Sequence, residues 1–189
     1  MKNIYHSDIY RFDTSVNSYW EDHLKENLDL EKLKKDTNSE IVVIGGGYTG
    51  LLCAINLIEN HNLDVILVEA GKIGWGASSR NAGFNCLPPS KMSFKKMQSI
   101  YGKEETKKFF KNSVEGSNHT KNIIKEYNID CDVTGDCNYI VAHHKNKFDQ
   151  IKDQAEVYKS EFGIETKIYS KEEFNEIGHG GTEQYGAFS

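Results

Sequence analysis

A glycine-rich turn between an apolar strand and a helix is the feature that most constrains the fold of this chain. The predicted strand covers residues 41–44 and runs directly into Gly-Gly-Gly-Tyr-Thr-Gly at residues 45–50. A helical segment follows, and a second apolar strand over residues 65–68 ends at Glu69. This order of strand, glycine turn, helix, strand and acid is the context in which a GxGxxG pattern binds a dinucleotide. We therefore expect an α/β fold with a Rossmann-like βαβ unit.

The three glycines of the pattern have separate roles. Gly45 allows the tight turn after the strand, and Gly47 lets the backbone approach a pyrophosphate. Gly50 allows close packing of the helix on the sheet, and the small Ala54 extends that contact. The free N–H groups at the start of the helix attract phosphate. An ordinary glycine turn without a ligand is disfavoured, because both strands and the helix occur in the required order.

Glu69 gives the pattern its preference among dinucleotides. At the end of the second strand, a carboxylate can accept hydrogen bonds from both hydroxyls of an adenosine ribose. Its negative charge repels a 2′-phosphate, so NADP is disfavoured. Glu69 therefore predicts FAD or NAD as the bound nucleotide.

Composition limits the classes of function. The chain has 189 residues, of which 38% are hydrophobic and 27% charged, with a net charge of −5. This composition predicts a globular protein of one domain or parts of two, and it disfavours nucleic acid or an anionic membrane as the main partner. We expect no membrane span and no export signal, hence a cytoplasmic location. The four cysteines form no CxxC pair and are expected to be reduced, with Cys53 in the core of the first long helix.

Apolar spacing predicts further elements beyond the βαβ unit. Residues 20–35 suggest a short surface helix or arm, residues 71–90 a loop that Pro88 and Pro89 close, and the last ten residues no helix or strand. A lone βαβ unit cannot cover both faces of a parallel sheet, so we expect the N-terminal part of a longer protein. The other expected elements are helices over residues 104–128 and 148–162, a helix that a capping box at Ser170 begins and Gly178 ends, and short strands over residues 138–142 and 164–169.

The loop over residues 74–83, Gly-Trp-Gly-Ala-Ser-Ser-Arg-Asn-Ala-Gly, separates FAD from NAD. An NAD site does not need a second loop of small and hydroxyl residues directly after the ribose acid. FAD extends further, through ribityl to isoalloxazine, and such a loop can line that path. Arg80 can offset the charge of the pyrophosphate. The alternative is a mobile polar surface loop.

These motifs resemble the FAD-dependent amine oxidases of the D-amino-acid oxidase superfamily, and most resemble its gamma-glutamylputrescine oxidase branch. The resemblance covers most of the chain. Some relatives carry a histidine in the 74–83 loop that bonds covalently to the flavin, and the matching position here is Arg80, so histidyl attachment is not expected. The segments that carry the resemblance are Tyr19-Trp20, VVIGGGYTGL at 42–51, Glu69-Ala70, GWGASSRNAG at 74–83 and YNIDCDVTG at 127–135.

The resemblance implies a domain plan and a cofactor site. It predicts an N-terminal arm over residues 1–39, the first part of a Rossmann-like FAD-binding domain over 40–136, and the start of an α+β substrate domain with an antiparallel sheet over 137–189. The predicted cofactor-binding residues are Gly45, Gly47, Tyr48, Thr49, Gly50, Glu69, Ala70, Gly76, Ala77, Ser78, Arg80, Asn81, Ala82 and Gly83.

The resemblance also implies the reaction. It predicts oxidation of an amine or an N-substituted amino acid by hydride transfer to flavin, with oxygen or another acceptor taking the electrons afterwards. The sequence names no catalytic residue. No metal site is expected, because His143, His144 and His179 have no carboxylate or cysteine at ligand spacing. Two alternatives stay open: an NAD-linked dehydrogenase, and a non-catalytic or truncated dinucleotide-binding module.

Overall fold

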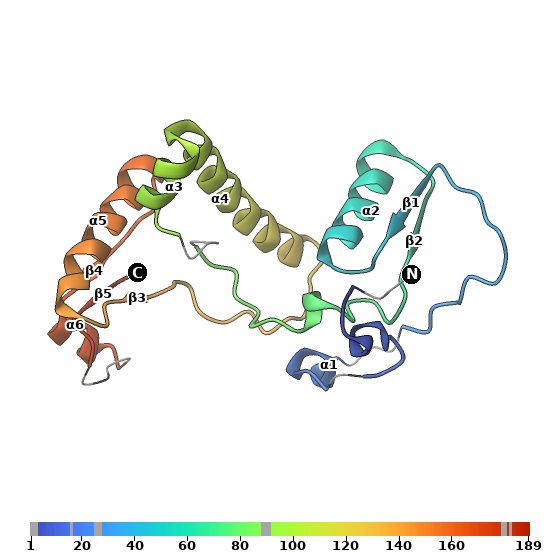
Figure 1. Cartoon of the computed structure of the whole chain (residues 1–189), viewed down its shortest axis with the longest axis horizontal. Coiled ribbons are helices and arrows are strands. Elements are labelled where there is room, and N and C mark those ends of the chain that lie inside the picture. Colours follow the sequence, from blue (N-terminus) through green and yellow to red (C-terminus); the bar gives the residue numbers. More distant parts are fainter. Residues whose placement is uncertain (1–3, 16, 25–27, 88–91, 179–180, 182) are drawn as a thin grey trace. The chain divides into compact units, whose positions relative to one another are not determined.

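The computed structural model forms two compact units, Met1–Phe84 and Asn85–Ser189 (Figure 1). It describes residues 4–15, 17–24, 28–87, 92–178, 181 and 183–189. Pro88, Pro89 and His179 therefore lie outside the described residues.

The first unit contains the predicted βαβ arrangement. Strands β1 and β2 pair in parallel, from Ile41 with Val65 to Ile44 with Val68. Both strands have the predicted bounds, and the helix between them is confirmed. The sequence suggests a short surface helix or an arm over 20–35; among its described residues, those at 20–23 belong to α1 and those at 28–35 form no regular element. The elements of this unit are η1 (Ser7–Tyr10), α1 (Tyr19–His23), β1 (Ile41–Ile44), α2 (Tyr48–His61), β2 (Val65–Val68) and η2 (Ala77–Ser79).

Helix α2 packs on β1 and β2 through its small residues. Ala54 is 7% exposed, and a Cβ added to Gly50 would overlap the carbonyl oxygen of Gly45. The other face of β1 is uncovered, since Val42 and Ile44 are 56% and 86% exposed. The expectation that Cys53 lies in the core is wrong: its side chain is exposed. Cys53 directly precedes the buried Ala54, and because each residue turns a helix by about 100°, its side chain points to a different side of α2.

In its described residues, the second unit combines four helices with a small antiparallel sheet in the order β3-β5-β4. The predicted helices and strands are present, with strands shorter than expected. Ser170 forms the predicted capping box, and Gly178 follows the last helix with φ +82°. The elements are α3 (Phe94–Tyr101), α4 (Lys103–Glu126), β3 (Ile140–Val141), α5 (Lys145–Phe162), β4 (Ile168–Tyr169), α6 (Lys171–Glu176) and β5 (Ala187–Phe188).

Strand β5 contradicts the expectation that the last ten residues contain no helix or strand. Ala187 and Phe188 form the middle strand, paired with β3 on one side and β4 on the other. They are 0% and 2% exposed. A two-residue strand shows no alternation in the sequence, and its partners lie far away along the chain, so local pattern could not reveal it.

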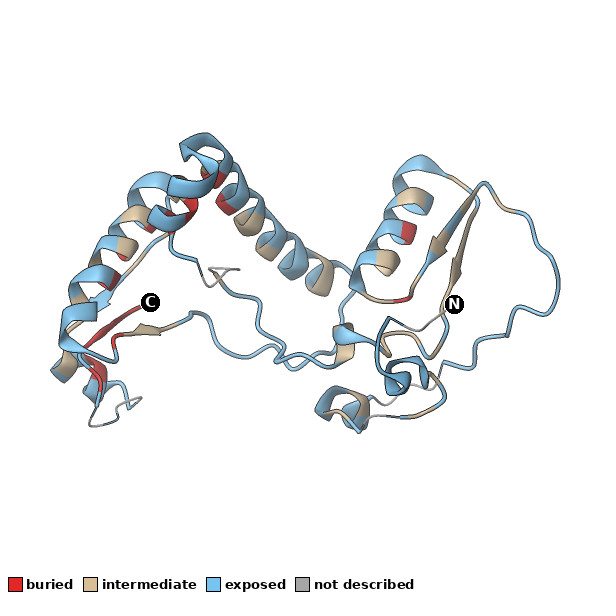
Figure 2. Ribbon diagram, in the orientation of Figure 1, coloured by how far each residue is buried: buried red, intermediate tan, exposed pale blue. Residues whose placement is uncertain are grey.

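The core of the second unit lies between α3, α4, α5 and β5 (Figure 2). Phe110 is 2% exposed, and its ring lies 5.3 Å from Phe94 and 5.2 Å from Phe162. An ion pair between Lys107 and Glu161 links α4 to α5 at the edge of this cluster. The sequence pattern did not predict helix α3. Its N-cap is Ser93, whose hydroxyl accepts a hydrogen bond from the N–H of Lys96.

Candidate functional site

The glycine turn joins the carboxyl end of β1 to the N-terminus of α2. Gly45 has φ +106° and donates its N–H to the carbonyl oxygen of Val68 at 2.8 Å. A Cβ added to Gly45 would meet nothing within 4 Å, so open space lies beside this part of the turn. Gly47 is the N-cap of α2, and no side chain of its own caps the helix. The first turn of α2 therefore presents backbone N–H groups, the donors that bind phosphate.

Glu69 is bound to the same turn. Its Oε2 atom accepts the N–H of Gly46 at 2.6 Å, and its Oε1 atom accepts the N–H of Gly71 at 2.9 Å. Partial burial raises the pKa of Glu69, but hydrogen bonds from the N–H groups of Gly71, Gly46 and Ala70 outweigh burial and hold the pKa below its ordinary value. The carboxylate is therefore held charged and fixed in orientation. Each oxygen can accept a further hydrogen bond, as a ribose hydroxyl would require.

The 74–83 loop packs on this turn. Gly74 donates its N–H to the carbonyl oxygen of Gly46 at 2.9 Å. The hydroxyl of Ser78 accepts the N–H of Tyr48 at 3.0 Å, so the loop supplies the hydrogen bond that Gly47 cannot. A Cβ added to Gly47 would lie 2.8 Å from the Ser78 hydroxyl. The two glycine-rich segments that the sequence singled out are thus in direct contact.

Asn81 organises the second half of the loop. Its side-chain amide donates to the carbonyl oxygens of Ala77 and Ser78, both at 3.0 Å. Its Oδ1 atom accepts the N–H of Gly83 at 2.7 Å, and Gly83 has φ +73°. These bonds hold the loop backbone in one conformation around η2.

Arg80 projects from the loop as an exposed cation. Its guanidinium lies 4.1 Å from the centre of the Trp75 ring, a cation–π contact. The ring limits the positions that the arginine side chain can take. The cation is therefore available to an anion beside the loop.

The predicted site residues divide into two groups. The structure joins most of them through the turn, Glu69 and the loop, whereas Thr49, Gly76 and Ala82 are exposed without a contact that links them to the others. Sequence reasoning missed Gly46 and Gly71, whose N–H groups bind Glu69, and Gly46 could have been inferred from its place inside the turn. It also missed that Trp75 supports Arg80.

The residues present fit a dinucleotide of the FAD or NAD type. The turn offers open space at Gly45 and backbone donors at α2, and Glu69 offers a fixed carboxylate with free acceptor capacity. Among the residues that the structure describes, no His, Cys, Asp or Glu side chains gather in a group of three that could hold a metal ion. The described part of the chain also has no helix that is long and apolar enough to cross a membrane.

Comparison with known proteins agrees with this geometry. A model of the DAO family, described as FAD dependent oxidoreductase, matches residues 40–188. Gamma-glutamylputrescine oxidoreductase of Escherichia coli (strain K12) is 32% identical over 117 residues, which are 62% of this chain and 27% of that protein. A Haemophilus influenzae protein named "Probable oxidoreductase OrdL" is 24% identical over 156 residues, 82% of this chain and 36% of that protein.

The chain therefore spans about a third or less of the length of these two relatives. The family match nevertheless covers the glycine turn, Glu69 and the 74–83 loop together. On this evidence, the chain belongs to the DAO family of FAD-dependent oxidoreductases.

Proposed function

We propose that this protein binds FAD at the β1–α2 turn and, as the full product of its gene, oxidises an amine or an N-substituted amino acid. The observation that carries the proposal is the contact between the 74–83 loop and the turn, through the hydrogen bond from Tyr48 to Ser78. This contact extends the dinucleotide-binding turn into a longer surface, as a flavin dinucleotide requires.

Each part of this surface is proposed to bind a different part of FAD. The N–H groups at Gly47 and Thr49, together with Arg80, would hold the pyrophosphate. Glu69 would accept hydrogen bonds from the adenosine ribose. The backbone of the loop from Gly76 to Gly83 would line the path of the ribityl chain and the ring.

The bound flavin supplies a two-electron acceptor, and the protein's share is to bind and orient it. The amine substrate is proposed from the similarity to a protein named gamma-glutamylputrescine oxidoreductase. Oxygen or another acceptor would receive the electrons in turn.

We propose residues 1–39 as an arm, 40–136 as part of the FAD domain and 137–189 as the start of the substrate domain. A cytoplasmic location stays a prediction.

Anaerobic mixing tests the proposed reaction. The full gene product, purified with its flavin, is mixed without oxygen with gamma-glutamylputrescine, with putrescine and with an N-methyl amino acid. We expect one of these compounds to bleach the visible flavin absorbance, and admitted oxygen or an artificial acceptor to restore it. Oxidation of an amine only when NAD⁺ is added would support the dehydrogenase alternative. Bound FAD that none of these amines reduces would contradict the proposed substrate class.

A further inference from the structure

Two tryptophans join the N-terminal arm to the 74–83 loop in a reciprocal way. The indole Nε1–H of Trp20, in the arm, donates to the carbonyl oxygen of Asn81 in the loop at 2.7 Å. The indole Nε1–H of Trp75, in the loop, donates to the carbonyl oxygen of Thr14 in the arm at 2.9 Å. Each bond connects residues that are 61 positions apart. We refer to Trp20 and Trp75 as the tryptophan pair.

Further contacts surround Trp75. The Phe12 ring meets it edge-on, with centroids 5.1 Å apart. A Cβ added to Gly71 would lie 3.2 Å from both the Phe12 carbonyl oxygen and the Trp75 ring, so a glycine suits this place. Lys72 lies 3.5 Å from the Glu21 carboxylate of α1. The arm therefore contacts the chain directly after Glu69 as well as the loop itself.

Trp20 lies over Gly83 at the end of the loop. A Cβ added to Gly83 would approach the Trp20 ring to 2.6 Å. Asn81, whose carbonyl oxygen accepts the Trp20 indole N–H, also binds the N–H of Gly83 through its side chain. Trp20 thus contacts the backbone at two points of the segment proposed to line the flavin.

The arm does not act as part of a hydrophobic core. Neither η1 nor α1 contains a buried residue. Trp20 is 38% exposed, although it makes a directed hydrogen bond. Contacts of this kind contribute little through burial but fix the position of the groups they join. Figure 1 shows the blue arm segments beside the green loop within the first unit.

We propose that the arm is a working part of the cofactor site, in which the tryptophan pair positions the 74–83 loop toward FAD. Trp75 acts through Arg80, whose guanidinium lies over its ring. Trp20 acts through the backbone of Asn81 and Gly83. Both are positioning residues. The inference rests on the proposed FAD binding and goes beyond it, because it assigns a role to a segment outside the dinucleotide-binding motif.

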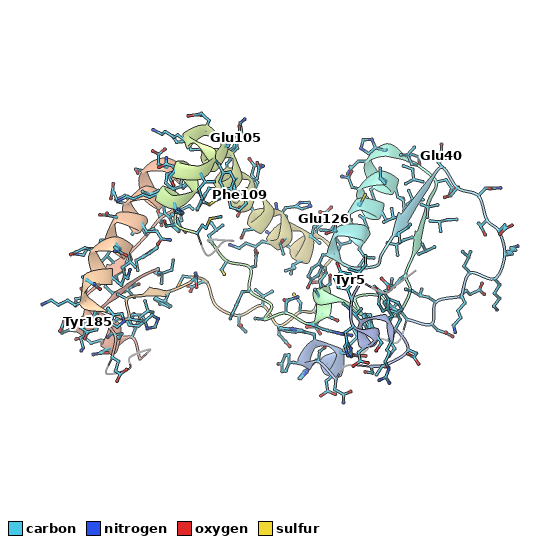
Figure 3. The ribbon with its side chains drawn as sticks, in the orientation of Figure 1. Tyr5, Glu40, Glu105, Phe109, Glu126 and Tyr185 are labelled. Atoms are coloured by element: carbon cyan, nitrogen blue, oxygen red, sulfur yellow. The ribbon has the colours of Figure 1, made fainter. Side chains whose placement is uncertain are left out.

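The first test measures FAD affinity of the full gene product after its flavin has been removed. The variants are Trp20→Ala, Trp20→Phe and Trp75→Phe, where each phenylalanine keeps a ring and removes the indole donor. Tyr5→Ala is the matched control, since Tyr5 is an aromatic residue of the same arm that is 64% exposed (Figure 3). We expect Trp20→Phe and Trp75→Phe each to raise the dissociation constant for FAD about fivefold, and Trp20→Ala to raise it more. Wild-type affinity in all three would overturn the proposal.

The second test observes the loop without cofactor. Trypsin cleaves after Arg80 when the loop can leave its place. In flavin-free protein, we expect Trp20→Phe and Trp75→Phe to be cut at Arg80 several times faster than Tyr5→Ala. Unchanged cleavage would contradict a positioning role. This readout also separates the two proposals: absent FAD binding in the wild type would refute the proposed function, while cleavage at Arg80 would still report on the arm.

A double-mutant cycle distinguishes positioning from general support of the fold. Arg80→Met keeps the aliphatic stem of the side chain and removes the cation. If Trp75 acts through Arg80, Trp75→Phe will weaken FAD binding less in the Arg80→Met background than in the wild type. Equal effects in both backgrounds would show that Trp75 only stabilises the unit, and the positioning proposal would be wrong.

Discussion

The carboxylate of Glu69 and the backbone N–H of Gly46 lie 2.6 Å apart, and this hydrogen bond ties the end of β2 to the turn after β1. Ile44 and Val68 pair in parallel at the ends of β1 and β2, so Gly46 and Glu69, which follow them, lie at the same end of the sheet. A second bond, from Gly71, fixes the other carboxylate oxygen. The acid that the sequence pattern assigns to ribose therefore also holds the glycine turn in place.

Acid should remove this contribution of Glu69 to stability. Its pKa in the folded protein lies below the ordinary value of 4.5, so the unfolded chain takes up the proton first as pH falls. The contribution is complete above that ordinary value and is lost as pH falls through the lowered pKa. We expect Glu69→Gln to reduce the free energy of unfolding at neutral pH and to flatten its fall in acid. Denaturant unfolding at several pH values measures this, with Glu31→Gln as the exposed control. A wild-type slope in Glu69→Gln would contradict the prediction.

Gly47→Val should abolish FAD binding, because its side chain would occupy the space of the pyrophosphate. The structure adds a second obstacle, since a Cβ at Gly47 would lie 2.8 Å from the Ser78 hydroxyl. The double variant Gly47→Val/Ser78→Ala separates the two causes. We expect it to stay unable to bind FAD in a fluorescence titration. Recovery of binding would show that displacement of Ser78, and not of the cofactor, is what the glycine prevents.

Two glycines inside helices should respond to alanine in opposite directions. Gly50→Ala should lower the free energy of unfolding by about 1–3 kcal/mol, because the added methyl group would overlap the carbonyl oxygen of Gly45. Gly116→Ala, in α4, should raise it by about 0.5–1 kcal/mol, because its Cβ meets nothing within 4 Å and alanine favours the helix. Denaturant unfolding followed by circular dichroism compares them. A stabilised Gly50→Ala variant would be incompatible with close packing of α2 on β1.

Replacing Phe109 or Phe110, neighbours in α4, by alanine should reduce the free energy of unfolding by very different amounts. Phe110 is 2% exposed, and Phe110→Ala should cost about 3–5 kcal/mol of unfolding free energy. Phe109 is 39% exposed (labelled in Figure 3), so Phe109→Ala should cost less than half as much. Denaturant unfolding followed by circular dichroism measures the free energy of unfolding of both variants. Similar costs would mean that the core does not lie on the Phe110 side of α4.

The sequence predicted the βαβ unit because its signals are local. Strands β1 and β2 are continuous apolar runs, and glycine and charged residues mark their ends. The longer helices repeat apolar residues over several turns, and Ser170 shows its capping box in four consecutive residues. Each of these features is decided by residues close together in the chain.

The features that the sequence did not reveal depend on residues far away along the chain, or on the direction in which one helical residue points, since each residue turns the helix by about 100°. Strand β5 is short and pairs with strands elsewhere in the chain. Cys53 has an apolar neighbourhood, but the contact stripe set by Gly50 and Ala54 turns it outward. Each hydrogen bond of the tryptophan pair joins residues 61 positions apart, and nothing in the local pattern of the arm predicts its partner.

The identity of the nucleotide bound by the full gene product tests the central claim most directly. The purified protein is denatured, and the released chromophore is separated and identified by its spectrum and mass. The account predicts FAD, released without covalent attachment at Arg80, in a ratio near one per chain. NAD bound tightly with no flavin, or a flavin that stays attached to a peptide containing Arg80, would contradict it.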